Sequence, residues 1–295
     1  MPLSVRPIRP DHPDFAGEIS GVDIAAGVSA DEAAKIEKAM DHYAVLVFHG
    51  QVIDDDQQYA FSQHFGPMEQ ATGDIAKLED RRLSLKVNDI SNLNRNGEVM
   101  ARDDRKRLFN LGNMLWHSDS SFKPTPAKYS LLSAREIPEG GGNTEFADMR
   151  AAWDALEPDL QEECLGLVCE HSQIYSRGLL GFSDWDEEER AKNAPVRQRL
   201  VRRHAGSGRL SLFLASHAGA IEGWPVPEAR MFLRDLIEHA TQRQFVYAHE
   251  WRQWDLVMWD NRAVMHRARR YDHTKVRDMH RTTVADSAPT LEQPI

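Results

Sequence analysis

The sequence has few cysteines, no long apolar run and no excess of positive charge. Among 295 residues only Cys164 and Cys169 carry thiols, and they lie five positions apart in a helix-like stretch. Two cysteines so close together predict neither a disulfide framework nor a zinc site, so we expect reduced thiols and a cytoplasmic protein. The amino terminus lacks the apolar core of a signal peptide. No apolar run approaches bilayer-spanning length, which predicts no membrane partner.

The charge balance is acidic. Lysine and arginine number 36 against 46 aspartates and glutamates, a formal charge of −10. Such a surface repels phosphate backbones, which predicts no nucleic-acid partner. Hydrophobic residues make up 41% and charged residues 28%, values typical of a globular enzyme. Without repeats or low-complexity linkers, we predict one domain over residues 1–295, with long polar insertions near 70–112 and 176–200 that serve an active site.

Short strand-like stretches dominate the pattern. Capping boxes at Ser29 and Asp54 each predict a helix, and helical patterns also cover 149–168 (interrupted at Pro158) and 226–241. The stretches that indicate strands are 44–48, 129–137, 144–146, 245–251, 255–259, 263–266 and 276–285. Many short strands with irregular insertions, rather than alternating strands and helices, favour a β-sandwich or jelly roll with helices packed outside.

The strongest local motif is Trp116-His117-Ser118-Asp119. In a strand, residues two apart point to the same face, so His117 and Asp119 would hold one ion together. An imidazole nitrogen and a carboxylate oxygen suit a borderline or hard divalent metal. His12 and Asp14 have the same spacing, but the intervening proline and the position near the terminus fit a loop, so we assign no metal there.

A third ligand is expected at His266, which follows His117 by 149 residues at the end of another strand-like stretch. Two histidines and one carboxylate occupy one face of an octahedral ion and leave three positions open, as an oxygen-activating Fe(II) site requires. The alternative for either histidine is a surface or hydrogen-bonded core residue, because the chain contains 13 histidines.

Basic residues gather after His266 in this acidic chain. Arg277 and Arg281 lie on one face of a predicted strand, about 13 Å apart at ~3.3 Å per residue. Residues 271–274 predict a hairpin turn that would bring this strand back beside the histidine strand. Because guanidinium groups bind carboxylates bidentately, the metal would have two anion-binding groups nearby. The alternative is a solvated basic strand that pairs with surface acids.

Taken in order, the motifs match a known family. The matching stretches are 44–50, 61–67, 115–122, 141–150, 204–209, 255–266 and 277–283. The chain resembles the Fe(II)/2-oxoglutarate dioxygenases of the taurine dioxygenase group, and within it the branch that cleaves phenoxyalkanoate herbicides. The family's pattern is His-x-Asp, a distant histidine and an arginine eleven residues later, which are His117, Asp119, His266 and Arg277 here. The resemblance implies a double-stranded β-helix, a jelly roll that is mostly β with flanking helices.

The resemblance also implies a role for each site residue. His117, Asp119 and His266 would hold Fe(II). Arg277 and Thr144, in a Gly-Gly-x-Thr turn, would bind the distal carboxylate of 2-oxoglutarate, and Asn113 would touch this cosubstrate. The substrate's acidic group would meet Arg281 and His204, and Trp259 would pack behind the metal. The herbicide branch carries basic residues before the first histidine; Lys77 and Lys86 are candidates here, whereas Glu98 is acidic where a lysine would fit.

The expected reaction consumes 2-oxoglutarate and O2 and hydroxylates the carbon beside the ether oxygen of an aryloxyalkanoate such as 2,4-dichlorophenoxyacetate. Its products would be a phenol, glyoxylate, succinate and CO2. One alternative is a sulfonate or alkylsulfate dioxygenase of the same group. Another is a cupin-like metal-binding protein without oxidative chemistry, which would leave Arg277 and Thr144 unexplained. We expect a small-molecule carboxylate as partner and a homo-oligomeric assembly.

Overall fold

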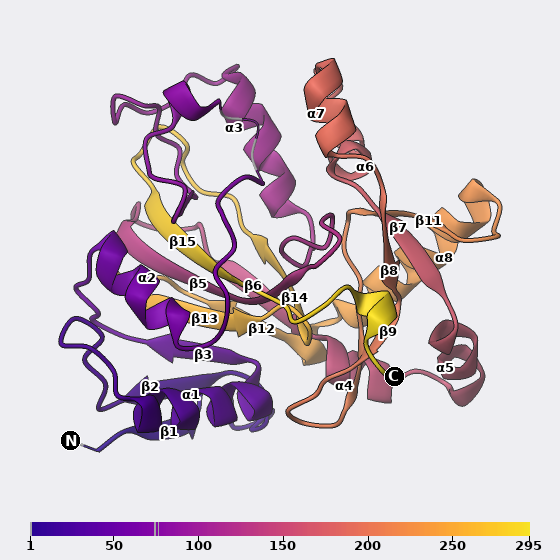
Figure 1. Cartoon of the computed structure of the whole chain (residues 1–295), viewed down its shortest axis with the longest axis horizontal. Coiled ribbons are helices and arrows are strands. Elements are labelled where there is room, and N and C mark those ends of the chain that lie inside the picture. The colour runs from indigo at the N-terminus through magenta and orange to yellow at the C-terminus, as the bar shows by residue number, and fades with distance from the viewer. Residues whose placement is uncertain (1, 74, 76) are drawn as a thin grey trace.

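A computed structural model describes the chain except for residues 1, 74 and 76. Its main element is a seven-stranded sheet, coloured in Figure 1 from indigo β1 to yellow β15. Its strands, in spatial order, are β1 (Ser4–Pro7), β2 (Gly17–Ser20), β3 (Val45–Phe48), β13 (Leu256–Asp260), β5 (Ala127–Glu136), β15 (Asp278–Ala285) and β4 (Asn88–Asp89). Only β2 and β3 run parallel, and every other pair in this sheet is antiparallel.

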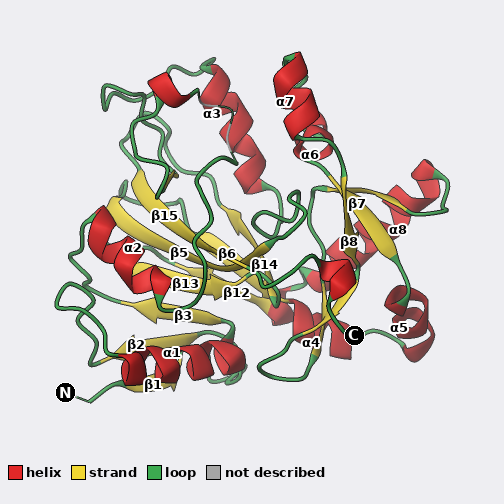
Figure 2. Ribbon diagram, in the orientation of Figure 1, coloured by secondary structure: helices red, strands yellow, loops and turns green. Residues whose placement is uncertain are grey.

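A second, smaller sheet packs against the first. It contains β12 (Val246–His249), β6 (Thr144–Asp148) and β14 (Val264–Ala268). One core cluster joins the two sheets and includes Val257 and Trp259 of the large sheet with Phe146 and Val264 of the small one. Two antiparallel sheets around a shared apolar layer form a jelly roll, as Figure 2 shows. This confirms the fold class predicted from the sequence.

The outer face of the large sheet is covered by α1 (Ala30–Tyr43) and α2 (Asp55–Gln63). Both begin at the predicted capping boxes, on Ser29 and Asp54. Side chains alternate along a strand, so β3 sends Val47 between the sheets and Leu46 toward the helices. Burial on both faces explains why β3 and β13 are continuous apolar runs.

A third packed region lies beside the two sheets. It contains a sheet of β11 (Ala218–Ile221), β7 (Val168–His171) and β8 (Val196–Arg199), and the pair β9 (Val201–Arg203) and β10 (Leu210–Leu212). Its helices are α4 (Met149–Asp154), α5 (Pro158–Leu165) and α8 (Val226–Ala240), and they share one apolar cluster with these strands. Three shorter helices, α3 (Arg105–Asn110), α6 (Gln173–Gly178) and α7 (Glu187–Lys192), stand over one end of the jelly roll.

One sequence expectation was wrong in detail. The turn at 271–274 does not form a hairpin, because β14 pairs with β6 whereas β15 pairs with β5 and β4. Consecutive strands here cross from one sheet to the other, which local turn signals do not reveal. The segment 176–200, expected as a polar insertion that serves the active site, contains α7 and β8, and its role stays a prediction. Among the helices that the structure describes, none has the length and apolar character needed to cross a bilayer.

Candidate active site

His117 and His266 meet at a short backbone bridge. The amide of His117 donates to the carbonyl of His266 over 3.0 Å, and the reverse bond measures 2.8 Å. The two imidazole centroids therefore lie 4.2 Å apart. Asp119 follows in a turn rather than in the regular strand expected, and the next residue, Ser120, has φ 54°. A single bridge and a turn thus bring the three side chains together.

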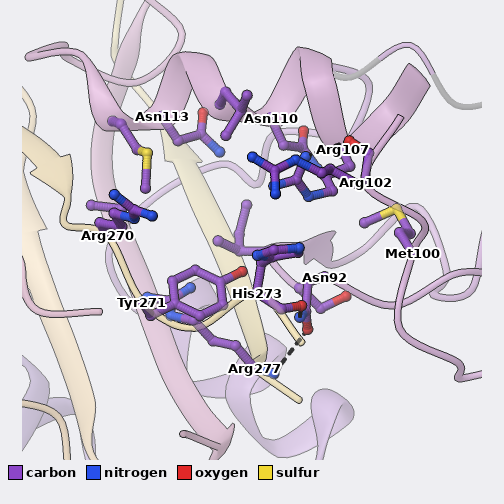
Figure 3. Close-up of a pocket in the computed structure, with 15 residues that line it drawn as sticks. Asn92, Met100, Arg102, Arg107, Asn110, Asn113, Arg270, Tyr271, His273 and Arg277 are labelled. Atoms are coloured by element: carbon purple, nitrogen blue, oxygen red, sulfur yellow. Dashed lines mark hydrogen bonds between the residues drawn. The ribbon is translucent and has the colours of Figure 1, made fainter. Parts of the chain in front are cut away.

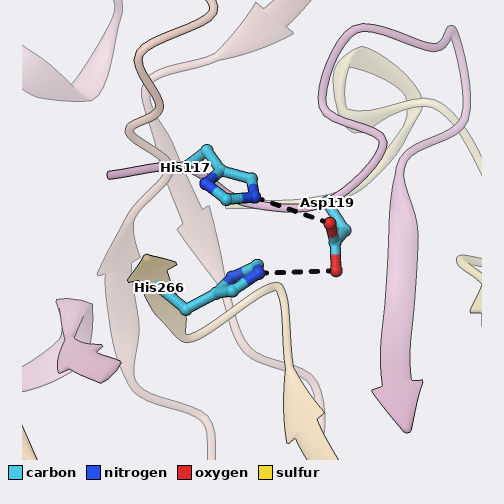
Figure 4. A group of neighbouring side chains, drawn as sticks. All are labelled: His117, Asp119 and His266. Carbon is cyan, nitrogen blue, oxygen red and sulfur yellow. Dashed lines mark ion pairs between the residues drawn. The ribbon is translucent and has the colours of Figure 1, made fainter. Parts of the chain in front are cut away.

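The three side chains form a compact donor set, shown in Figure 4. Nε2 of His117 lies 3.8 Å from Oδ1 of Asp119, and Nε2 of His266 lies 3.7 Å from Oδ2. One potential ligand atom from each residue lies within 4.8 Å of the others, and the described residues contain no second such group. All three are buried. Two imidazoles and one carboxylate fit Fe(II) with open positions.

Neighbouring groups orient these donors. Nδ1 of His117 bonds the carbonyl of Leu115 over 2.7 Å, which directs Nε2 toward Asp119. Ser130 Oγ donates to Asp119 Oδ2 over 2.7 Å, and the amide of Asp119 donates to Oδ1 of Asn261 over 3.0 Å. The ring of Trp259 lies 4.7 Å from that of His266. Such contacts fix ligand geometry before an ion arrives.

Electrostatics keep the donors in the form that binds metal. Burial lowers the pKa of both His117 and His266, which favours neutral imidazole. Burial alone would raise the pKa of Asp119, but Arg281 and the two imidazoles outweigh it and hold the pKa below its usual range. Arg281 donates directly to Oδ1 of Asp119 over 2.5 Å. The carboxylate is therefore ionised and already carries one guanidinium partner.

Arg277 and Thr144 lie on one side of this cluster. Together with Asn113 they line a narrow cavity of about 30 Å³ that also reaches His117 and His266. Arg277 is buried and donates to the carbonyl of Gly142 over 3.4 Å. Burial lowers its pKa, and no carboxylate of the described residues forms an ion pair with it. An unpaired buried guanidinium is suited to receive an anion.

Two residues beside the cluster were not predicted from any sequence pattern. Arg177 and His217 line a cavity of about 50 Å³ with His117, Asp119 and Arg281. Arg177 is 3% exposed, and its Nε has no hydrogen-bond partner. Burial lowers the pKa of Arg177 to about 10.

The space for the Arg177 guanidinium depends on a glycine. A Cβ at Gly112 would lie 2.3 Å from Cζ of Arg177, so only glycine permits this approach. The guanidinium also lies 4.5 Å from the ring centroid of Phe109. Arg177 comes from the helix α6 and therefore had no recognisable spacing to the metal motif. The guanidinium thus packs against an aromatic ring in the space that a glycine leaves free, and this site accommodates a positive charge.

His204 lies outside the site, which corrects its assignment as a substrate-binding residue. Its Nε2 bonds Oδ2 of Asp260 over 2.8 Å, and its Nδ1 contacts Ser207 over 2.9 Å. It is 1% exposed and lines none of the cavities at the metal cluster. The motif around His204 connects β9 and β10, so its histidine stabilises a turn and the end of β13.

The basic residues proposed before the first histidine also lie elsewhere. Lys86 pairs with Asp56 over 2.9 Å at the surface. Lys77 is exposed and lines a separate surface cavity with Arg105 and Lys106. Glu98 is exposed and accepts from Asn94. None of the three lines the cavities beside His117 and Asp119.

The geometry agrees with comparisons to known proteins. The family described as "Taurine catabolism dioxygenase TauD, TfdA family" matches residues 4–283. The chain belongs to this family. It is 50% identical over 283 residues to the alpha-ketoglutarate-dependent 2,4-dichlorophenoxyacetate dioxygenase of Cupriavidus pinatubonensis, covering 95% of this chain and 98% of that protein. The crystal structure of AAD-2 with Mn(II) and N-oxalylglycine matches with TM-score 0.95 and 55% identity, covering 98% of this chain and 100% of that one.

A more distant relative is the alpha-ketoglutarate-dependent sulfate ester dioxygenase of Pseudomonas putida. It is 26% identical over 285 residues, covering 93% of this chain and 88% of that protein. Membership of the family confirms the predicted enzyme class, a 2-oxoglutarate-dependent dioxygenase that uses iron and O2 and acts on a small molecule. The alternative of a metal-binding protein without oxidative chemistry is thereby excluded.

Proposed function

We propose that this enzyme hydroxylates the carbon beside the ether oxygen of an aryloxyalkanoate such as 2,4-dichlorophenoxyacetate. The observation that carries the proposal is the cavity beside His117 and Asp119, where Arg177 is a buried cation without a carboxylate partner. The names of the relatives at 48–50% identity support the same substrate class. His117, Asp119 and His266 are the proposed iron ligands.

The two sides of the cluster separate the two acids that the reaction needs. We assign the distal carboxylate of 2-oxoglutarate to Arg277 and Thr144, with Asn113 at the boundary between the cavities. The carboxylate of the aromatic substrate belongs in the other cavity, with Arg177, His217 and Arg281, the last of which lines both cavities. Arg177 supplies a positive charge there that no carboxylate of the described residues pairs with, and this suits an anion better than a neutral ligand.

The aromatic ring needs apolar walls. Phe109, Phe122 and Ile90 line the cavity on the same side as Arg177. Apart from Asp119, two acids line this cavity: Glu69 pairs with Lys123, and Asp89 pairs with Arg82 and Lys106. Their charges are thus neutralised by the protein and do not repel an incoming carboxylate.

Bound iron supplies the oxidation of a C–H bond by O2, coupled to the oxidative decarboxylation of 2-oxoglutarate to succinate and CO2. The protein's part is placement. Arg281, Arg177 and His217 hold the carboxylate so that the adjacent methylene carbon faces the ligand cluster. Insertion of one oxygen atom there gives a hemiacetal. Cleavage of its C–O bond, with transfer of the hydroxyl proton to the leaving oxygen, releases the phenol and glyoxylate.

A substrate panel tests this proposal. The Fe(II) enzyme is supplied with 2-oxoglutarate, O2 and one candidate: phenoxyacetates, both enantiomers of a phenoxypropionate, an alkylsulfonate or an alkylsulfate. We expect phenol and succinate with the phenoxy acids and basal succinate with the sulfur compounds. Two results together would contradict the substrate class: no phenoxy acid yields phenol, and a sulfur compound yields sulfite or sulfate. They would favour a sulfonate or alkylsulfate dioxygenase instead.

We also propose a single-domain enzyme that works as a homo-oligomer in the cytoplasm. The buried free thiols Cys164 and Cys169, whose pKa burial raises to about 12, suit a reducing compartment. Exposed Leu179 and Leu180 supply apolar surface for contact between copies. Light scattering after size exclusion tests the assembly, and a monomer at micromolar concentration would contradict it.

A further inference from the structure

A large cavity opens beside Arg277 and shares Ile90, Asn110 and Asn113 with the proposed substrate cavity. It has a volume of about 380 Å³. Its walls come from the segment around α3, from the loop between β14 and β15, and from residues 90–92, 100 and 102. Figure 3 shows Arg102 and Arg107 on one side of this space and Tyr271, His273 and Arg277 on the other. The cavity therefore connects the proposed 2-oxoglutarate site to the surface.

The walls of this cavity are cationic. Arg102, Arg107, Arg270 and Arg277 line it, and no aspartate or glutamate does. This contrasts with a chain whose formal charge is −10. Arg102 and Arg270 are exposed, and within the described part of the chain neither forms an ion pair or a side-chain hydrogen bond.

Four guanidinium groups without a countercharge repel one another, and an anion between them offsets that repulsion. The remaining walls combine apolar side chains, from Ile90, Met100, Leu111 and Met114, with uncharged polar ones such as Asn92 and Asn110. Several cationic groups beside apolar side chains match a short dicarboxylate, whose two anionic ends are joined by methylene groups. A phosphate would satisfy the arginines but would leave the apolar walls unmatched.

We propose that this cavity is a dicarboxylate-binding vestibule, in which Arg102 and Arg270 capture 2-oxoglutarate before Arg277 receives it and through which succinate leaves. Electrostatic capture raises the rate of association and weakens as salt screens the charges. The inference rests on the proposed role of Arg277 and does not depend on which aromatic acid is the substrate.

The test measures the association and dissociation rates of 2-oxoglutarate with the Fe(II)-loaded enzyme under strict exclusion of oxygen, by stopped-flow tryptophan fluorescence. The variant is Arg102→Gln combined with Arg270→Gln. We expect its association rate at low ionic strength to fall about 10-fold, within the range of electrostatic steering, with a smaller change in the dissociation rate. The deficit should vanish in high salt. Succinate, as a competitor, should lose affinity in the same variant.

A matched control removes the same two charges elsewhere. Arg190 in α7 and Arg243 are exposed and line none of the cavities named above. Arg190→Gln combined with Arg243→Gln should change the association rate by less than two-fold. The proposal would be overturned if the association rate of Arg102→Gln with Arg270→Gln were unchanged, or if the control variant lost as much. It would also be overturned if only the dissociation rate changed. Failure of the wild type to bind 2-oxoglutarate at all would instead contradict the proposed Arg277 site as well.

Discussion

Arg277, which directly precedes β15, and Arg281, within β15, have different surroundings. Arg281 already donates to Asp119, whereas Arg277 has no carboxylate partner among the described residues. The free guanidinium charges at the metal cluster are therefore those of Arg277 on one side and Arg177 on the other. At the residue scale, we therefore assign 2-oxoglutarate to the side of Arg277 and the aromatic acid to the side of Arg177.

Loss of a ligand should abolish turnover with little effect on the fold. His117→Ala, Asp119→Ala and His266→Ala each remove one donor from a set of three, and we expect activity to fall by at least about 100-fold, at the upper end of losses for supporting residues. The iron content shows whether the metal has been lost, and circular dichroism shows whether the fold is kept. A variant that keeps full activity and iron would remove that residue from the proposed set.

Arg277→Ala should affect the cosubstrate selectively. Losing a desolvated charge pair costs about 2–5 kcal/mol, which is roughly 30-fold to several thousand-fold in affinity. We therefore expect the KM for 2-oxoglutarate to rise by at least that lower factor, with a much smaller change for the aromatic acid. Steady-state kinetics with each substrate varied in turn measure both constants. Equal increases in both would contradict the assignment.

His204 and His217 should separate stability from substrate binding. His204→Ala removes a buried bond to Asp260 and should lower the free energy of unfolding by about 1–3 kcal/mol while the KM values stay unchanged. His217→Ala removes a group from the substrate cavity, and we expect the KM for an aryloxy acid to rise roughly 10-fold or more. Denaturant titration and kinetics are compared for both variants. The opposite pattern would restore the sequence-based role of His204.

At the element scale, β15 is fastened by a histidine with two acidic partners. Nδ1 of His280 lies 2.5 Å from Oδ1 of Asp55, and Nε2 lies 3.2 Å from Oδ1 of Asp278. Burial alone would lower the pKa of His280, but the bonds to Asp278 and Asp55 outweigh it and raise the pKa. The charged imidazole thus stabilises the strand that follows Arg277.

This predicts a pH dependence with a definite sign. Because the folded-state pKa is raised, the stabilisation is complete below about pH 6.5, the ordinary histidine value, and is lost as pH rises through the folded-state pKa. The difference in unfolding free energy between wild type and His280→Gln should therefore shrink between pH 6 and pH 9. Urea titrations of both proteins measure it. A difference that stays constant over this range would show that the charge on His280 contributes nothing.

Elements were predictable where local chemistry decides them. The helices after Ser29 and Asp54 begin where their capping boxes indicate, and the apolar run at 44–48 is a strand buried on both faces. The site was predictable where a motif spacing carries it, as for His117, Asp119 and His266. Arg177 and His217 were missed, because their positions depend on how the third packed region folds against the jelly roll and no spacing encodes that. His204 was misassigned because a motif match does not show which way a turn faces.

At the scale of the whole molecule, the fold divides the work between its two sheets and the region beside them. The sheets hold the metal cluster between β14 and the turn after His117, and β15 follows Arg277 and carries Arg281. The helix α6, which contacts β11 of the third packed region, adds Arg177, and the aromatic walls come from Phe109 of α3 and from Phe122 in the turn after Asp119. We therefore propose that one buried cluster couples the oxidation of 2-oxoglutarate to the cleavage of an aryl ether.

The stoichiometry of products tests that claim most directly. Phenol and succinate are measured in the same reaction of the Fe(II) enzyme with 2-oxoglutarate, O2 and 2,4-dichlorophenoxyacetate. We expect close to one phenol per succinate. When the aromatic acid is withheld, phenol should disappear and succinate should fall to a slow basal rate. Succinate formed at the full rate without any phenol, or phenol formed without 2-oxoglutarate, would contradict it.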